Sequence, residues 1–400
     1  MSYLPAFTIV ATLFLGGIML SSKGATAYAE PEAEPGKLMQ PENCLNTTVF
    51  HDDGKFAGWP ANNGVWTWGG EEILVGFTVG PYEVKSGHNL GEPYRSLLAR
   101  SKDGGLTWES YDPDHFIGDG DNLKMLDQSI DTKSPGFALR VTGIGYHGNE
   151  LPEGGFYYSM DRGNSWKGPF RFKGIESEQA LDTMELSPRT DYLVEDDGSL
   201  KVFISARIPE VFGSDRLFCA VSKDGGIHFK LRGWIVPLTD PFRGVMSSTV
   251  HCSGKKLVSC VRRREIGTER CWIDAFVSGD DGENWMFLSK IGDTGPGNGN
   301  PPALLRLRDG RLVCAYGQRE RRQIIAKVSE NEGEDWGPEI VLRNDFQADK
   351  YDDADLGYPR MVQRPDGKVV TIYYWATETM PEQQIAATIW DPDNLVPFGN

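Results

Sequence analysis

Short stretches rich in apolar and β-branched residues alternate along the chain with polar segments rich in glycine. Phe156-Tyr157-Tyr158 and Ala275-Phe276-Val277 are two such apolar stretches. Runs of this length and composition between turn residues are typical of β-strands. Further strands follow a glycine turn that occurs four times: Asp197-Gly198, Ser253-Gly254, Asp309-Gly310 and Asp366-Gly367. The pattern predicts an all-β protein whose short strands are joined by tight turns.

The polar segments contain one motif five times, with the pattern Ser-x-Asp-x-Gly-x-x-Trp. Its copies lie 51 to 63 residues apart and begin at Ser101, Ser159, Ser222, Ser278 and Ser329. The third copy has Phe229 in place of Trp, and the fifth has Asn331 in place of Asp. Ser and Asp side chains can cap the backbone N–H groups of a tight turn, and Gly accepts a positive φ. The motif is therefore structural, and its spacing is that of successive propeller blades.

The two repeats together predict a six-bladed β-propeller. Each blade reads strand, glycine turn, strand, loop, strand, box motif, strand, with about 50 residues per blade. The blades are expected to begin near Gly64, Gly136, Arg189, Val245, Pro301 and Tyr358. The last blade has no box, and residues 44–50 are expected to supply its fourth strand and close the ring. A degenerate seventh blade at 111–135 is the alternative.

The first residues are not expected to belong to this fold. Residues 4–20 are almost all apolar, and Ala27-Tyr28-Ala29 has the form of a cleavage site. We interpret residues 1–29 as a signal peptide, 30–43 as a linker and 44–400 as one propeller domain. The protein is then exported, either secreted or periplasmic, with no stable membrane partner after cleavage. An uncleaved membrane anchor is the alternative.

Composition narrows the choice of partners and cofactors. The chain has 41 basic and 57 acidic side chains, a net charge of −16, which argues against nucleic-acid binding. No phosphate-binding loop appears, and the six cysteines match no zinc pattern. Cys260 and Cys271 could face each other or remain free thiols, and Asp119-Gly120-Asp121-Asn122 is read as a plain turn. We therefore expect no cofactor and no metal.

The five boxes resemble those of the sialidase (neuraminidase) superfamily, over about residues 44–392. The resemblance implies a propeller that holds a substrate carboxylate with three arginines. It also implies a Tyr nucleophile assisted by a Glu, and an Asp acid/base. The same scaffold resembles polysaccharide lyases and noncatalytic glycan-binding propellers, so the site must be argued from its residues.

Three arginines occupy matching places in successive blades. Each lies nine residues after the glycine of its turn: Arg207, Arg263 and Arg319. Equivalent positions of a propeller surround one opening, where three guanidinium groups could clamp a carboxylate. The alternative is that each arginine is a surface residue paired with an acidic neighbour, Glu210, Glu265 or Glu320.

Tyr358 opens the last blade, where the family places its nucleophile, and Glu210 or Glu185 is the candidate glutamate. The loop before the first box holds His88 but no Asp. His88 suits a lyase, in which His or Tyr removes a proton and the arginines neutralise a uronate. Further polar and aromatic residues are expected around the same opening: Trp59, Asn62, Arg189, Asp191, Asn300 and Arg360.

The sequence thus predicts an enzyme that acts on an acidic oligosaccharide or polysaccharide. A sialidase-like glycoside hydrolase that removes a terminal acidic sugar is the first hypothesis. A lyase acting on uronic-acid glycans and a noncatalytic glycan-binding propeller are the alternatives.

Overall fold

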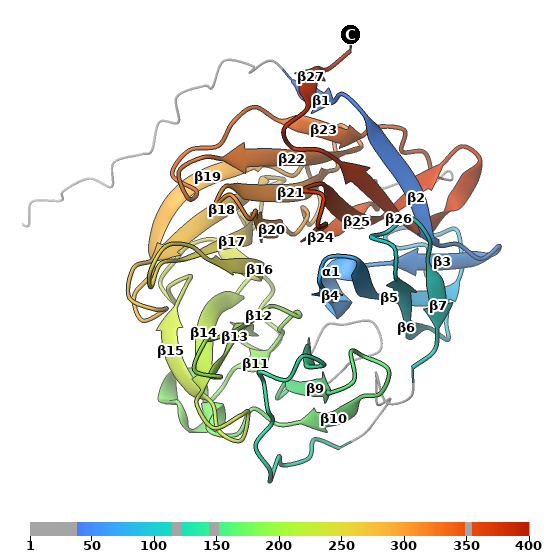
Figure 1. The fold of residues 1–400 in the computed structure, drawn as a ribbon. Coiled ribbons are helices and arrows are strands. Elements are labelled where there is room, and N and C mark those ends of the chain that lie inside the picture. Colours follow the sequence, from blue (N-terminus) through green and yellow to red (C-terminus); the bar gives the residue numbers. More distant parts are fainter. Residues whose placement is uncertain (1–37, 114–121, 144–151, 349–353, 400) are drawn as a thin grey trace, which may run out of the picture. The chain divides into compact units, whose positions relative to one another are not determined.

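The computed structural model describes residues 38–113, 122–143, 152–348 and 354–399. Six small sheets are arranged around a centre as the blades of a β-propeller (Figure 1). The predicted all-β class and the count of six blades are confirmed. The predicted signal peptide and the turn residues Asp119–Asp121 lie outside the described residues. In the described part, no helix is long and apolar enough to cross a membrane.

The first three blades follow the chain from residue 55 to residue 234. Blade 1 consists of β3 (Lys55–Gly58), β4 (Val65–Trp68), β5 (Glu72–Pro81), β6 (Arg95–Ser101) and β7 (Glu109–Tyr111). Blade 2 consists of β8 (Ala138–Thr142), β9 (Gly155–Ser159) and β10 (Lys167–Phe170). Blade 3 consists of β11 (Glu185–Leu186), β12 (Tyr192–Val194), β13 (Leu200–Arg207), β14 (Arg216–Ser222) and β15 (Lys230–Trp234). Short helical turns are α1 (Pro60–Asn63), η1 (Ile175–Ser177) and η2 (Gln179–Leu181).

The last three blades have four antiparallel strands each at their core. Blade 4 consists of β16 (Arg243–His251), β17 (Leu257–Arg264), β18 (Cys271–Ser278) and β19 (Met286–Asp293). Blade 5 consists of β20 (Ala303–Arg306), β21 (Leu312–Gln318), β22 (Gln323–Ser329) and β23 (Ile340–Arg343). Blade 6 consists of β24 (Gly357–Gln363), β25 (Val369–Thr377), β26 (Met380–Trp390) and β2 (Cys44–Phe50).

The N-terminal strand closes the last blade as predicted. β2 runs antiparallel to β26, with Cys44 opposite Trp390 and Thr48 opposite Ala386. The fold also includes part of the predicted linker. A short strand β1 (Met39–Pro41) pairs with β23 and with β27 (Leu395–Pro397), and so extends blade 5. The sequence signal for β1 was too short to recognise.

Ring closure by β2 leads to a stability prediction. Without β2, the backbone groups of β26 form an open edge that can pair with other chains. We expect a chain that begins at Asp52 to lose more than about 4 kcal/mol of unfolding free energy, beyond most single substitutions. A chain that begins at Glu42 keeps β2, loses only β1 and serves as the control. Chemical denaturation of the two shortened chains measures the difference, and equal midpoints would contradict the role of β2.

The five box motifs form the turns that the sequence predicts. In every copy the serine Oγ accepts a hydrogen bond of 2.8 Å from the backbone N–H four residues on, at a glycine with positive φ. The box tryptophans do not all pack to the same depth. Trp166 is buried, whereas Trp108, Trp285 and Trp336 are half-buried. The turn geometry is thus common to all copies, but the depth of the indole between blades is not.

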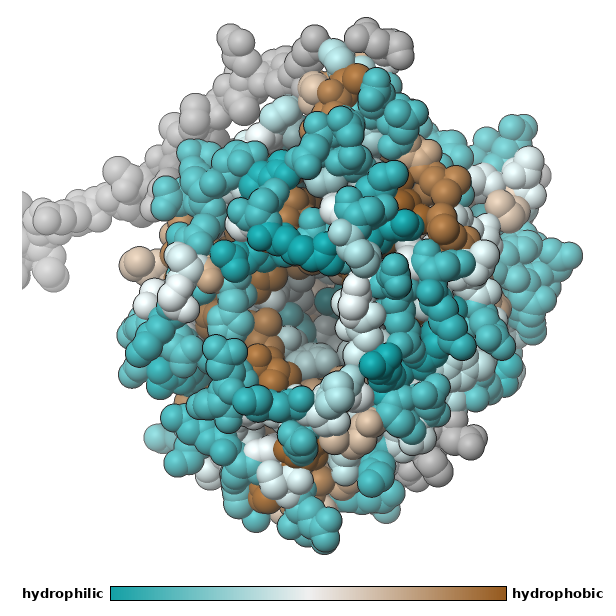
Figure 2. Space-filling model, viewed as in Figure 1, coloured by the Kyte–Doolittle hydropathy of each residue, from teal (hydrophilic) through white to brown (hydrophobic). Residues whose placement is uncertain are grey.

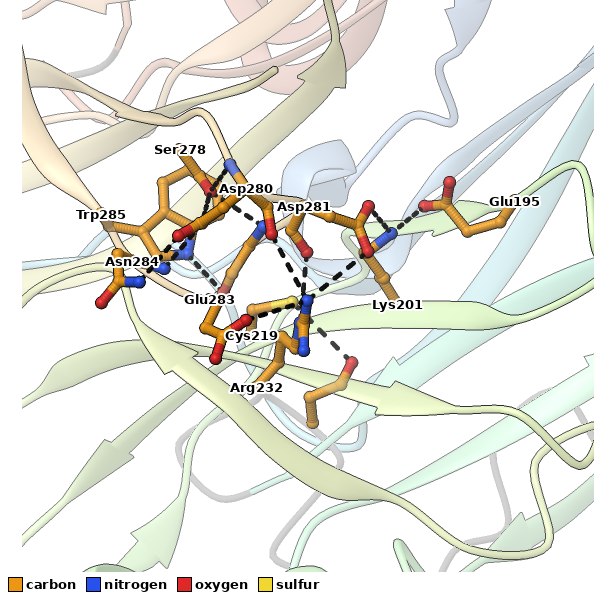
Figure 3. Close-up of polar contacts among 12 residues, drawn as sticks. Glu195, Lys201, Cys219, Arg232, Ser278, Asp280, Asp281, Glu283, Asn284 and Trp285 are labelled. Carbon is orange, nitrogen blue, oxygen red and sulfur yellow. Dashed lines mark hydrogen bonds and ion pairs between the residues drawn. The ribbon is translucent and has the colours of Figure 1, made fainter. Parts of the chain in front are cut away.

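The fourth box also connects blade 4 to blade 3 (Figure 3). Asp281 of this box accepts a hydrogen bond of 2.7 Å from Lys201 on β13, and Glu195 pairs with the same ammonium group. Arg232 on β15 reaches the backbone of Asp281 and the carboxylate of Glu283. Burial disfavours the charge of Lys201, but its two carboxylate partners outweigh burial and raise its pKa. Blades 3 and 4 are therefore held together by ion pairs around the buried Lys201 ammonium as well as by apolar contacts.

All six cysteines are free thiols. Cys271 pairs with Arg264 across the β17–β18 ladder, whereas Cys260 lies opposite Ala275 and interacts with Cys314. Cys260 and Cys271 therefore do not face each other, and of the two predicted alternatives the free thiols are confirmed.

Candidate active site

The centre of the propeller is where the inner strands meet, and the molecular face is hollowed there (Figure 2). Tyr358 lies on β24, the inner strand of blade 6. Its φ of 49° is in the left-handed region, and it precedes a proline, a combination that is sterically costly. The side chain of Asn300 holds this backbone, because it accepts the Tyr358 N–H at 2.8 Å and donates to the Leu356 carbonyl at 2.8 Å. Such strain is retained where surrounding contacts enforce it, often at functional sites.

Two other bulky residues near Tyr358 have the same unusual backbone. Trp59 (φ 59°), also before a proline, and Met246 (φ 58°) belong with Tyr358 to one buried cluster. They come from blades 1, 4 and 6, so the strained positions converge on one place. Convergence of three such residues identifies this region, rather than the outer strands, as the candidate active site.

The Tyr358 hydroxyl lies in a positive environment. It accepts a hydrogen bond of 3.0 Å from Nη1 of Arg262, whose guanidinium carbon lies 5.6 Å from the Tyr358 ring centre. Burial alone would raise the pKa of Tyr358, but the charges of Arg262, Arg319 and His88 outweigh it and lower this pKa to about 8. A tyrosine in this state supplies a phenolate far more readily than an ordinary tyrosine does.

A His–Asp pair stands beside the tyrosine. Nδ1 of His88 lies 2.9 Å from Oδ2 of Asp355, and the Tyr374 hydroxyl donates to the other oxygen of this carboxylate. Burial disfavours the charged imidazole, yet the charge and hydrogen bond of Asp355 raise the pKa of His88. Asp355 is itself buried, and His88 and Arg319 overcome that burial and keep its pKa low. The pair can therefore hold a proton on His88, whose side chain is 38% exposed.

Among the described residues, Asp355 is the acidic partner of Arg319. Its guanidinium lies 3.8 Å from Asp355, beyond hydrogen-bond distance, and its buried Nε has no hydrogen-bond partner among the described residues. The residue is only 8% exposed. A buried guanidinium without hydrogen-bond acceptors is costly, so an anionic group of a ligand would find donors ready here.

Strand pairing corrects the predicted set of three arginines. The box serines of blades 3, 4 and 5 pair with equivalent leucines: Leu200, Leu257 and Leu312. Seven residues beyond each leucine stand the truly equivalent arginines: Arg207, Arg264 and Arg319. Counting from the glycines selected Arg263, because the turn at Gly254 is one residue longer. A one-residue shift turns a side chain to the opposite face of its strand.

The predicted convergence of Arg207, Arg263 and Arg319 is therefore not what the structure has. Arg263 is buried in ion pairs with Asp240 (2.6 Å) and Asp274 (3.2 Å). Arg207 donates to Glu185 at 3.0 Å, so it is paired with a carboxylate, but with Glu185 and not with the neighbouring Glu210. Glu210 is exposed in the following turn, and no contact in the described part joins it to Tyr358. Of the three arginines, Arg319 alone lies beside the tyrosine.

The other predicted residues support the centre of the ring. Arg360 donates to the carbonyls of Ala61 and Thr190, and Arg189 donates to Asn62 at 3.0 Å. These bonds join blades 1, 3 and 6. Asp191 is buried and accepts from Ser247, at 2.5 Å, and from Thr249. The ring of Trp59 meets that of His88 at 4.8 Å, and so forms one wall of the site.

Three site residues were missed at the sequence level: Arg262, Asp355 and Tyr374. Arg262 and Tyr374 occupy equivalent positions on the second strands of their blades. Arg262 lies five residues after Leu257, where β17 begins, and Tyr374 lies five residues after Val369, where β25 begins. Counting from strand pairing would have found them, but the pairing is known only from the structure. No cluster of His, Cys, Asp and Glu in the described residues could hold a metal ion.

The comparisons with known proteins agree with this architecture. Residues 137–371 match the family model of the BNR repeat-like domain. A protein of unknown function from Dyadobacter fermentans is similar in structure, with a TM-score of 0.66, 20% identity, and coverage of 88% of this chain and 99% of that one. A Hadza microbial sialidase has a TM-score of 0.57 and 14% identity, with coverage of 88% and 69%. The α-L-arabinanase of Penicillium chrysogenum, solved with arabinobiose, has a TM-score of 0.57 and 13% identity, with coverage of 88% and 100%. No curated protein matches the chain.

The fold and its five boxes thus define an Asp-box propeller, and the predicted resemblance is confirmed. Because the family model matches more than half of the chain, the protein belongs to the BNR repeat-like family. At these identities the structural neighbours establish the fold alone.

Proposed function

We propose that the protein is a glycoside hydrolase that removes a terminal acidic sugar from a glycan, with Tyr358 as its nucleophile. The observation that carries the proposal is the Tyr358 hydroxyl, which Arg262 holds at 3.0 Å and whose pKa is lowered to about 8. A sugar with a carboxylate beside its reacting carbon repels a carboxylate nucleophile. A tyrosine avoids much of this repulsion, and sialidases use one for this reaction.

In the proposed first step, the Tyr358 phenolate bonds to the anomeric carbon and the glycosidic C–O bond breaks. His88, protonated and held by Asp355 at 2.9 Å, gives its proton to the leaving oxygen. In the second step, His88 takes a proton from water, the water oxygen bonds to the anomeric carbon, and Tyr358 leaves as phenolate. Each step balances, and the enzyme returns to its starting state.

Arg319 is the proposed partner of the substrate carboxylate. Its guanidinium is buried and hydrogen-bonds to no described residue, so a bidentate pair with a carboxylate would satisfy it. The predicted signal peptide fits an enzyme that is exported and meets its acidic glycan outside the cell.

A β-eliminating lyase acting on a uronic acid is the second candidate. The observation that favours it is that no Glu or Asp contacts the Tyr358 hydroxyl in the described part of the chain. In this reaction the Tyr358 phenolate would remove the C5 proton, the C4–O bond would break as a C4–C5 double bond forms, and His88 would protonate the leaving oxygen. Arg319 would neutralise the carboxylate in either case.

A product assay distinguishes the two reactions. The protein is incubated in parallel with sialylated and uronate-containing glycans, and the products are identified by mass spectrometry. The hydrolase adds one water per bond cleaved, whereas the lyase yields an unsaturated uronate without water. Release of an acidic sugar with the addition of one water supports the hydrolase. An unsaturated uronate contradicts the hydrolase and supports the lyase.

The lowered pKa of Tyr358 predicts a specific pH dependence. The first step requires the Tyr358 phenolate together with a protonated His88, so the dependence of kcat/KM on pH should be bell-shaped, and one of its two limbs should reflect the Tyr358 pKa of about 8. Arg262→Gln removes the nearest positive charge and should move that limb by about 1–2 pH units toward the ordinary tyrosine pKa near 10. Arg308→Gln is the control, because the Arg308 side chain bonds, among the described residues, to the backbone carbonyls of Arg364 and Pro365 and not to the site. An unchanged profile in Arg262→Gln would remove Tyr358 as the titrating group.

A further inference from the structure

An exposed aromatic ring lies close to the candidate active site, on the loops that follow β13 and β17. Phe212 is 61% exposed, and Ile266 of the next blade is 41% exposed. The two loops touch, because a Cβ on Gly213 would lie 2.4 Å from the Ile266 side chain. Together they present an exposed apolar surface, and neither Phe212 nor Ile266 belongs to a core cluster of the described residues. Exposed apolar surface with a polar border is typical of binding sites.

Two guanidinium groups border this surface. The guanidinium carbon of Arg264 lies 5.3 Å from the Phe212 ring centre, and that of Arg243 lies 5.5 Å from it. Arg243 is neutralised by Asp215 at 2.7 Å, whereas Arg264 has no carboxylate partner among the described residues. Its buried Nε also has no hydrogen-bond partner there. Arg264 is thus an uncompensated positive charge beside an exposed ring, in a chain with a net charge of −16.

The acidic residues of the same loop are engaged elsewhere. Glu265 faces Arg270 at 3.9 Å, and Glu269 accepts the Gly297 N–H at 2.8 Å. Neither pairs with Arg264 among the described residues. The charge of Arg264 beside Phe212 therefore favours an anionic ligand group.

A chain of contacts joins this surface to the Tyr358 hydroxyl. Arg264 donates to the side chain of Asn298, and the backbone carbonyl of Asn298 accepts from Nε of Arg262 at 2.7 Å. Arg262 in turn donates to Tyr358. The exposed ring therefore stands one arginine–asparagine–arginine relay away from the proposed nucleophile. A substrate longer than one sugar, bound with its end at Tyr358, would therefore make a second contact with the protein at Phe212 and Arg264.

We propose that Phe212 and Arg264 form a second sugar-binding subsite, which holds an acidic sugar adjoining the one that reacts. The apolar face of the sugar ring stacks on Phe212, and its carboxylate or sulfate pairs with the guanidinium of Arg264. The subsite makes the protein selective for glycans with successive acidic residues. The chemistry at the sugar that reacts rests on the proposed function, whereas binding of an acidic sugar at Phe212 and Arg264 does not.

Binding to an inactive protein tests the subsite independently of the reaction. Calorimetry on Tyr358→Phe measures affinity for a uronate oligosaccharide, a sulfated oligosaccharide and a neutral one. We expect Phe212→Ala or Arg264→Gln, added to Tyr358→Phe, to weaken binding of at least one acidic ligand about 10-fold. Arg264→Lys should recover only part of the loss, because lysine lacks the planar fork. Phe287→Ala is the matched control, since Phe287 is 56% exposed on an outer strand.

The outcomes separate the subsite from the reaction. Weaker binding of acidic but not neutral ligands supports the subsite even if the active protein cleaves none of them, in which case only the proposed function fails. Comparison of the uronate oligosaccharide with the sulfated oligosaccharide shows which anionic group the subsite binds. Affinities unchanged from those of Tyr358→Phe, or lowered equally by Phe287→Ala, would overturn the proposal. With cleavage established, Phe212→Ala should raise KM for an oligosaccharide and leave it unchanged for a single sugar with a small leaving group.

Discussion

Tyr358→Phe is expected to lower kcat by at least about 1000-fold, as removal of a nucleophile does in other enzymes. The substitution removes one hydroxyl and keeps the ring, which packs against Tyr374 at 5.9 Å between ring centres. The fold should therefore survive, and affinity for an acidic glycan should change little. Rate measurements under saturating substrate, combined with calorimetric binding to the same glycan, separate the two effects.

Tyr374→Phe is the matched control for this prediction. It also removes one buried tyrosine hydroxyl, but that hydroxyl donates to Asp355 and not to the reacting atoms. We expect a smaller loss of activity and an altered pH profile, because Asp355 positions His88. If Tyr358→Phe keeps a tenth or more of the activity, Tyr358 is neither nucleophile nor base.

Arg319→Leu is expected to lower kcat/KM by about 30- to 1000-fold, which corresponds to about 2–4 kcal/mol of transition-state binding. The guanidinium is buried and makes no hydrogen bond to the described residues, so its main partner is expected to be the substrate. Arg319→Lys should recover little, since a point charge cannot replace the fork. Thermal unfolding of each variant shows whether the propeller itself has been damaged.

A substrate analogue whose carboxylate has been reduced to an alcohol is the control for Arg319. The wild-type protein should lose most of its activity on this analogue, and Arg319→Leu should cause little further loss. Losses that are not additive in this way are expected only if the Arg319 guanidinium contacts the substrate carboxylate. Independent, additive losses would mean that Arg319 acts through Asp355, which lies 3.8 Å away, and not on the substrate.

The fold could be predicted from the sequence because its signals are local and repeated. One turn contains all the hydrogen bonds that Ser101, Asp103 and Gly105 make with one another, so the spacing of these residues does not depend on the rest of the fold. Closure by residues 44–50 followed from a missing strand in the last blade. β1 escaped notice because its three residues form a strand only beside β23 and β27, which lie far away in the chain.

The site was predicted only in part, for reasons of register. Tyr358 and His88 were singled out from their places in the blades, and the structure brings them together through Asp355 and Arg319. The choice of Arg263 over Arg264 came from one additional residue in a turn, which sequence spacing alone does not reveal. Asp355 belongs to an acidic stretch of the sequence just before Tyr358, but its role could not be assigned, because that role depends on the fold that carries His88 to it from a loop 267 residues away.

The most direct test of the account is to trap the bond that Tyr358 is proposed to form. A fluorinated, carboxylate-bearing glycosyl fluoride slows release of a covalent intermediate, and peptide mass spectrometry then locates the attached sugar. The account predicts one added sugar on the peptide that contains Tyr358, and none in Tyr358→Phe. A sugar attached to another residue, or turnover of a natural acidic glycan to an unsaturated product with no attachment, would contradict it.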